Sequence, residues 1–110
     1  MSNEVDFIAL LKYNTPEEGG RSVPAFPHYR PQVKFPFSTM QTSGRQIFID
    51  KEIVYPGEVV KAKIKIIATE FFQNCLEEGM NFDFREGHKI IGTGQIIKIV
   101  NETLKKSSTE

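Results

Sequence analysis

The chain has 110 residues, of which 39% are apolar and 25% charged, and its 14 Lys and Arg residues balance 14 Asp and Glu residues. This length predicts one domain with a modest core, and the charge balance excludes a protein-wide field that would attract nucleic acid or an anionic membrane. A single cysteine excludes an internal disulfide and a cysteine metal cluster, which is typical of a reducing compartment. We see no signal-peptide pattern and no apolar run approaching membrane-spanning length, so we expect a cytoplasmic protein with no membrane contact.

The first apolar segment, Glu4–Tyr13, is ambiguous in its periodicity, because its alanine and leucines suit a helix. Thr15-Pro16 ends the segment, since the residue before a proline is disfavoured in the helical region. The next stretch, Glu17–Gln32, contains adjacent glycines and three prolines. These residues control the backbone, so they predict a long turn with a rigid path rather than a helix or a regular strand.

Two strands and two turns are predicted in the middle of the chain. Val33–Phe37 alternates apolar and polar residues, with Pro36 predicted at an edge or a bulge because it cannot donate to a ladder. Gln41–Arg45 reads as a turn and Gln46–Tyr55 as a further strand. Pro56-Gly57 is a tight-turn pair.

Residues 60–66 give the clearest strand signal of the sequence. The apolar residues Val60, Ala62, Ile64 and Ile66 alternate with Lys61, Lys63 and Lys65. Period two predicts that the apolar set is buried and that the lysines are exposed. The lysine face has two interpretations: a solvated face that discourages edge-to-edge pairing, which we favour, or a stripe that faces phosphate.

The last third of the sequence predicts a long connection and a hairpin. Ala68–Gly79 is expected to hold a helical turn near Cys75-Leu76, and its Phe71-Phe72 pair to cap an open barrel end or, less favoured, to contact a partner. Met80–Val100 is typical of a hairpin that turns at residues 85–88. The domain is predicted over residues 1–103, followed by a polar tail at 104–110.

The sequence does not predict an enzyme. There is no phosphate-binding loop of the G-x-x-x-x-G-K-[ST] type, so we expect no nucleotide, no GTP hydrolysis and no cofactor. His28 and His88 lack the spacing of a metal-ligand pair, and Cys75 is interpreted as a small packed apolar residue. The IGTG at Ile91–Gly94 lies within a strand pattern, where its glycines indicate strand curvature or a close backbone approach.

Several motifs, taken in order, resemble the third domain of elongation factor Tu. They are EEGGR at Glu17–Arg21, YRPQ at Tyr29–Gln32, SG at Ser43-Gly44, PGE at Pro56–Glu58, and GMNFDFREG with IGTG between Gly79 and Gly94. The resemblance covers residues 5–100 and implies an all-β fold, a single closed antiparallel barrel of six strands, in which residues 4–13 form the first strand. We expect the chain to be a stand-alone copy of that domain.

The resemblance implies a set of RNA-binding residues, because the third domain of elongation factor Tu holds the T-arm backbone of aminoacyl-tRNA. Residue by residue, the match places that role on Arg21, Ser22, Gln32, Ser43, Glu86 and Gly87. Arginine pairs with phosphate, while the amide and hydroxyl groups bond ribose or phosphate.

Two departures bear on that role: Ser22 stands where the family commonly has a histidine, and Ala68 where it has a lysine. The expected function is therefore a non-catalytic, translation-factor-like binding module whose partner is tRNA or another structured RNA. The alternative is a protein-interaction module whose partner is a GTPase or another protein, since the family domain also packs on its GTPase domain and meets an exchange factor. Phosphate pairing supplies most sequence-independent affinity, so the cation missing at Ala68 weighs against the first reading.

Overall fold

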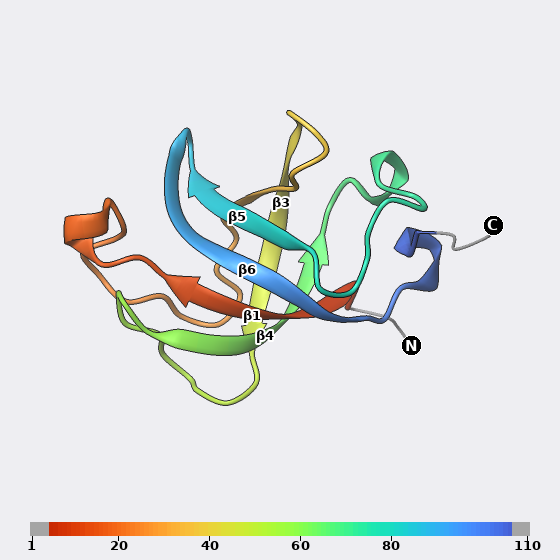
Figure 1. The fold of residues 1–110 in the computed structure, drawn as a ribbon. Helices are drawn as coiled ribbons and strands as arrows, with labels where there is room; N and C mark the ends of the chain where they lie inside the picture. The colour runs from red at the N-terminus through yellow and green to blue at the C-terminus, as the bar shows by residue number, and fades with distance from the viewer. Residues whose placement is uncertain (1–4, 107–110) are drawn as a thin grey trace.

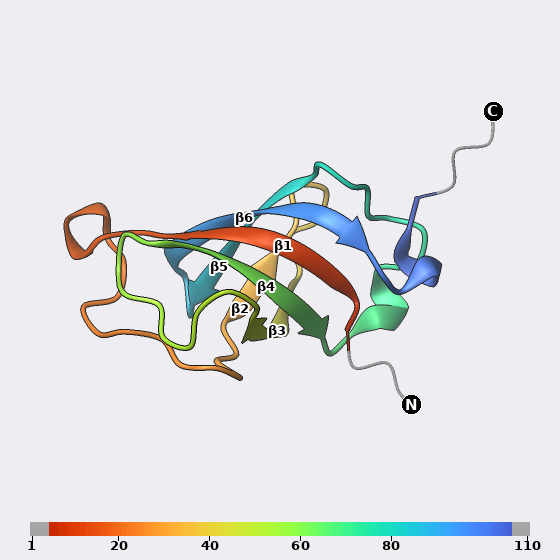
Figure 2. The same cartoon turned by 90° about the horizontal axis from the view of Figure 1, so that it is seen from below.

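A computed structural model describes residues 5–106 as a closed barrel of six antiparallel strands (Figure 1). The strands are β1 (Phe7–Tyr13), β2 (Gln32–Lys34), β3 (Gln41–Phe48), β4 (Val59–Ile66), β5 (Asn81–Glu86) and β6 (Lys89–Ile99). Around the barrel they follow the order β1-β4-β3-β2-β5-β6, and Figure 2 shows β6, β1 and β4 running side by side. The predicted all-β class and six-stranded closed barrel are confirmed. Residues 1–4 and 107–110 lie outside the described part of the chain. Glu4, the first residue of the predicted first strand, is one of them.

Strand β4 follows its predicted alternation. Its inward side chains, Val60, Ala62, Ile64 and Ile66, are buried, while Lys61 and Lys63 are exposed, as predicted. Lys65 is half-buried because its ammonium lies 3.7 Å from the Asp6 carboxylate. β4 pairs with β1 on one side and with β3 on the other, so it is an interior strand of the barrel wall.

The barrel is filled largely by aromatic rings. Phe7, Phe35 and Phe82 meet edge to face, with centroids between 5.7 and 6.1 Å apart. Phe72, from the long connection after β4, joins them at 5.2 Å from Phe35. Such offset contacts add stabilisation beyond the burial of apolar surface, so this cluster ties β1, β2 and β5 to the connection.

The turn predicted at Gln41–Arg45 is wrong, because these residues begin β3. Three of the four inward positions of this strand, Thr42, Gly44 and Gln46, are polar or small and therefore hide the period-two signal. Gly44 is required by packing, since a Cβ there would lie 2.6 Å from Val33 Cγ2. Buried Gln46 accepts a hydrogen bond from the Tyr13 hydroxyl, which satisfies its amide oxygen inside the barrel.

The strand predicted over Gln46–Tyr55 is also wrong beyond Phe48, where β3 ends and a loop begins. Within this loop Val54 alone forms a bridge, with Ala25 of the first long connection. The Pro56-Gly57 turn is confirmed, with Gly57 at φ +90° and the Glu58 amide donating to the Tyr55 carbonyl at 3.0 Å. Similarly, β2 is shorter than the predicted Val33–Phe37, because Pro36 lacks a donor and the chain turns there.

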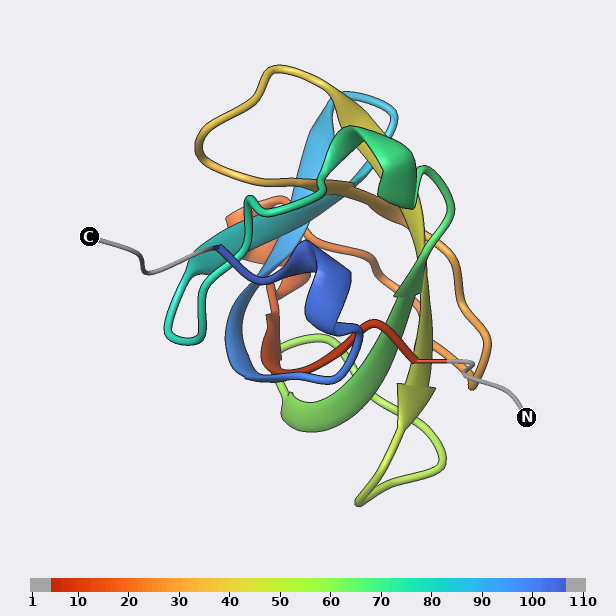
Figure 3. The same cartoon turned by 90° about the vertical axis from the view of Figure 1, so that its right-hand side faces the viewer.

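The end of the barrel near the chain termini is closed by two short 3₁₀ helices, η2 (Thr69–Phe71) and η3 (Glu102–Leu104), as Figure 3 shows. The helical turn predicted near Cys75-Leu76 is wrong, because the Leu76 amide donates to the Leu104 carbonyl at 2.8 Å and holds the chain extended. The predicted polar tail needs correction at its start, since Leu104 is fully buried. Of the two phenylalanines predicted to cap this end of the barrel, Phe72 is buried, with 1% of its surface exposed. Phe71, in contrast, is 62% exposed.

The connection between β1 and β2 has the rigid path that its composition predicts. It opens with a third 3₁₀ helix, η1 (Pro16–Glu18), whose first turn is capped by the Thr15 hydroxyl accepting from the Glu18 amide. Ala25 then bridges to Val54, and Tyr29 to Gln46, so the connection is pinned along the barrel. These bridges fix where Arg21 and Tyr29 lie.

Candidate nucleic-acid interface

Arg21 is held by four groups on one side of the barrel. Its guanidinium forms an ion pair with Glu86, with Nη1 and Oε2 2.5 Å apart. It also donates to the carbonyls of Val23 and Pro24, at 3.3 and 3.2 Å. The guanidinium carbon lies 4.6 Å from the centre of the Tyr29 ring, in a cation–π contact. Arg21 therefore joins its own loop to the β5–β6 hairpin.

Glu86 is the shared acceptor of this cluster, because the Tyr29 hydroxyl donates to the same carboxylate oxygen. Burial alone would raise the pKa of Glu86, but hydrogen bonds from Tyr29 and Arg21 outweigh it and lower the pKa below its ordinary value. For Arg21, burial lowers the pKa, and the hydrogen bonds to Glu86 and Tyr29 reverse the effect and raise it. Burial raises the pKa of Tyr29, which stays a neutral donor. The cluster thus holds one cation and one anion at neutral pH.

Strand register brings the other predicted residues into one row beside this cluster. Gln32 of β2 is the direct partner of Ser43 in β3 and of Arg85 in β5. Glu86 follows Arg85, and Gly87 opens the two-residue turn to β6 with φ +64°. Arg21, Gln32, Ser43 and the adjacent pair Glu86-Gly87 therefore come from four parts of the chain to one region of the surface.

The two departures from the family pattern lie in different surroundings. Ser22 is exposed next to Arg21. Ala68 is half-buried at the end of β4, where its amide donates to Thr42 Oγ1 at 3.2 Å and its methyl packs against the core. A methyl group in that place supplies no charge to a phosphate.

Three further cations lie at neighbouring positions in the strand pairing. The set of RNA-binding residues predicted from the sequence does not include them. Arg45 of β3 pairs with Lys65 of β4. Arg30 lies opposite Arg45, because the register that joins Tyr29 to Gln46 also joins Gln32 to Ser43. The lysine alternation in residues 60–66 predicts that Lys65 lies on the outer face of a strand. The position of Arg45 could not be predicted in this way, because the sequence predicts a turn at Gln41–Arg45.

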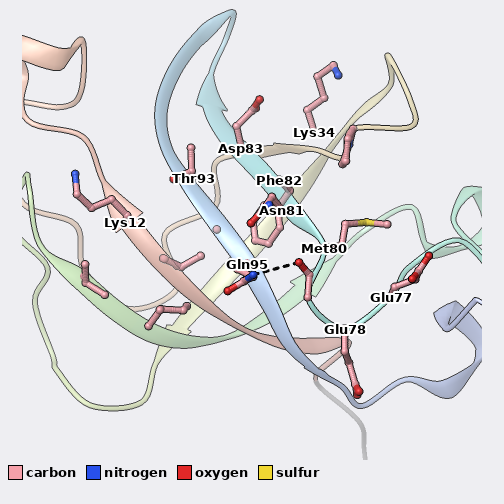
Figure 4. A pocket seen from close by; sticks show the side chains of 16 residues that line it. Lys12, Lys34, Glu77, Glu78, Met80, Asn81, Phe82, Asp83, Thr93 and Gln95 are labelled. Atoms are coloured by element: carbon pink, nitrogen blue, oxygen red, sulfur yellow. Dashed lines mark hydrogen bonds between the residues drawn. The ribbon is translucent and has the colours of Figure 1, made fainter.

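A broad groove of about 1020 Å³ lies elsewhere, on the outer wall of β1, β5 and β6 (Figure 4). Lys12, Lys34 and Asp83 stand along it, and Gln95 donates to the Gly79 carbonyl at 3.2 Å across its floor. None of the predicted RNA-binding residues lines it. Within residues 5–106 no group of three or more His, Cys, Asp or Glu residues could hold a metal ion, and no helix is long and apolar enough to cross a membrane.

Comparison with known protein families shows which family the chain matches. The family model described as the elongation factor Tu C-terminal domain matches residues 2–100, nearly the whole chain. This range includes all six strands and every residue of the predicted RNA-binding set. The match agrees with the six-stranded closed barrel and with the order of the sequence motifs. The chain belongs to the elongation factor Tu C-terminal domain family.

Proposed function

We propose that this chain is a non-catalytic binding module that contacts the backbone of a structured RNA helix, such as a tRNA T-arm, in the cytoplasm. The observation that carries the proposal is the register Arg85–Gln32–Ser43, which aligns an amide and a hydroxyl beside the Glu86-Gly87 turn. Amide and hydroxyl groups bond ribose and phosphate oxygens without reading base sequence. The family supports the translation-related class of this role.

Arg21 has a different part in this proposal from the one that the sequence predicts. Its guanidinium is shared among Glu86, two carbonyls and the Tyr29 ring. A guanidinium with these contacts binds a phosphate less strongly than a solvated guanidinium does, because its ion pair with Glu86 must be broken or shared. We therefore assign Arg21 to holding the loop and hairpin in place, and the RNA contact to Gln32, Ser43 and the Gly87 turn.

The test is fluorescence anisotropy with a labelled tRNA T-arm hairpin, comparing the wild type with the double variant Gln32→Ala/Ser43→Ala. Loss of two hydrogen bonds should weaken binding about tenfold. The matched control is Thr93→Ala/Gln95→Ala, the same loss of one hydroxyl and one amide, on the outer face of β6. We expect it to bind as the wild type does. Absence of wild-type binding at about 50 mM salt would contradict the proposal.

That negative result would favour the second candidate function, binding of a protein partner. Phe37, Ile67 and Phe71 are exposed at the end of the barrel closed by η2. Exposed apolar side chains gathered at one end are typical of protein contacts. This candidate makes no use of Gln32 or Ser43, so the double variant should bind such a partner normally.

A further inference from the structure

The neutral total charge conceals an uneven distribution of charge over the fold. The six strands carry nine of the 14 Lys and Arg residues but only two of the 14 Asp and Glu residues. Both strand carboxylates, Asp83 and Glu86, are already paired with arginines. The outer wall of the barrel is therefore cationic, although the chain as a whole produces no net field.

Cations of β3, β4 and the connection before β2 form one patch. We name it the cationic wall and define it as Arg30, Arg45, Lys61, Lys63 and Lys65. Alternate residues along a strand are about 6.7 Å apart and neighbouring strands about 4.8 Å apart, so the patch extends about 13 Å along β4. Arg30 lies two residues before Gln32, and Arg45 two residues after Ser43, which makes the wall continuous with the Gln32–Ser43 pair.

The register places like charges beside one another. Arg45 stands directly opposite Lys65, and Arg30 opposite Arg45, on neighbouring parts of the barrel wall. Lys65 is partly relieved by Asp6, but the Asp6 carboxylate also accepts from the Ile66 amide and the Asn101 side chain. Among residues 5–106, Lys61 and Lys63 form no ion pair.

The closed topology removes one explanation for the lysines. Lysines on an edge strand prevent pairing with another chain, which is the interpretation favoured from the sequence. β4, however, pairs with β1 over residues 59–64 and with β3 over residues 62–66, and the Ile49 amide donates to the Lys61 carbonyl at 2.8 Å, so no free edge is present for Lys61 and Lys63 to protect. A bound polyanion would relieve the mutual repulsion of the wall.

We infer that the cationic wall is a second nucleic-acid contact, on which the phosphate backbone of the bound RNA helix lies. The inference rests on the proposed function, because the helix that meets Gln32 and Ser43 continues over Arg30 and Arg45. The wall supplies the cations that the site otherwise lacks, since Ala68 carries no charge and Arg21 is engaged with Glu86. Arg30, Lys61 and Lys63 are members with no internal ion pair among the described residues.

The experiment measures T-arm hairpin binding by anisotropy across a series of salt concentrations for the wild type and Lys61→Gln/Lys63→Gln. Each lost phosphate contact should reduce the slope of log affinity against log salt by about one, so the double variant should lose about two. The matched control, Lys105→Gln/Lys106→Gln, removes two cations at the end closed by η3 and should keep the wild-type slope. All variants change exposed side chains, so their thermal unfolding should match the wild type.

The outcomes separate this inference from the proposed function. If Lys61→Gln/Lys63→Gln keeps the wild-type slope while Gln32→Ala/Ser43→Ala loses affinity, the wall is overturned and the proposed function stands. If the slope falls while Gln32→Ala/Ser43→Ala binds normally, the wall stands and the proposed contact residues are overturned. Displacement of the RNA by polyglutamate at equal charge concentration would also overturn the wall as an RNA site, because an acidic peptide would then suffice.

Discussion

At the scale of single residues, Glu86 shows how a predicted ligand-binding group acts within the fold. The sequence predicts an RNA contact for Glu86, and in the structure its carboxylate accepts from both Arg21 and Tyr29. These partners come from the connection before β2, whereas Glu86 ends β5. Glu86 therefore fixes the distance between the loop and the hairpin on which Gly87 sits.

We predict that Glu86→Gln lowers the free energy of unfolding by about 1 kcal/mol at pH 7, a small value because the Glu86 side chain is 42% exposed. The pKa of Glu86 is lowered in the folded protein from its ordinary value of 4.5, so the carboxylate stabilises the fold above that pH. This contribution should disappear as the pH falls through the folded-state pKa. Urea unfolding of the wild type and of Glu86→Gln, at pH 7 and at pH 3, measures the difference in stability at each pH.

The control for this comparison is Glu52→Gln, which removes an exposed carboxylate from the loop after β3. It should change stability little at either pH. A Glu86→Gln penalty that remains the same size at pH 3 would show that shape, rather than charge, accounts for the role of Glu86.

At the scale of elements, β6 depends on two inward glycines. A Cβ on Gly92 would lie 2.2 Å from Phe84 Cζ and 2.7 Å from the Lys12 carbonyl oxygen. A Cβ on Gly94 would lie 2.4 Å from Phe82 Cζ. The predicted close backbone approach is confirmed at Gly92, where the Lys12 carbonyl comes close, whereas at Gly94 the close atoms belong to side chains. The rings of β5 occupy the space that both glycines leave.

We predict that Gly92→Ala destabilises the protein by about 3 kcal/mol, at the upper end for overpacking because one of the clashing atoms is backbone. The neighbouring substitution Thr93→Ala, on the exposed face of the same strand, should cost less than about 0.5 kcal/mol. Chemical denaturation of both variants checks the pair. Equal stabilities would mean that β6 shifts freely to accept the extra carbon.

At the scale of the whole molecule, one end of the barrel is closed by a plug, a group of buried side chains that lie outside the strands. Phe72, Leu76 and Leu104 are all buried at one end, although each lies in a connection or after the last strand. Phe72 contacts both Phe35 and Phe37, at centroid distances of 5.2 and 6.2 Å. Closing this end completes the core that the six short strands begin.

We predict that Phe72→Ala costs about 3–5 kcal/mol of stability, the usual range for removing a buried ring. Phe71→Ala, one residue away and 62% exposed, should cost less than about 0.5 kcal/mol. Thermal and urea unfolding of the two variants give the comparison. Similar losses in both would mean that the plug is held by the backbone of the connection rather than by the Phe72 ring.

The sequence by itself determined those features that depend on neighbours along the chain. The period-two pattern of residues 60–66 predicted the inward face of β4, because successive side chains of any strand point to opposite sides. Pro56-Gly57 predicted its turn from backbone angles alone. The ordered motifs predicted the fold and the family, since glycines and prolines at fixed places are needed to build this barrel.

Only the tertiary structure decided which residues meet. The start of β3 does not follow the apolar alternation because Thr42, Gly44 and Gln46 face inward. Gln46 is acceptable there because Tyr13 satisfies its amide oxygen, and Gly44 because Val33 fills the space. Arg21 and Glu86 are 65 residues apart in the sequence and meet only when the barrel closes. The cationic wall depends on both: the alternation of Lys61, Lys63 and Lys65 is a local pattern, but only the register between strands places Arg45 and Arg30 beside it.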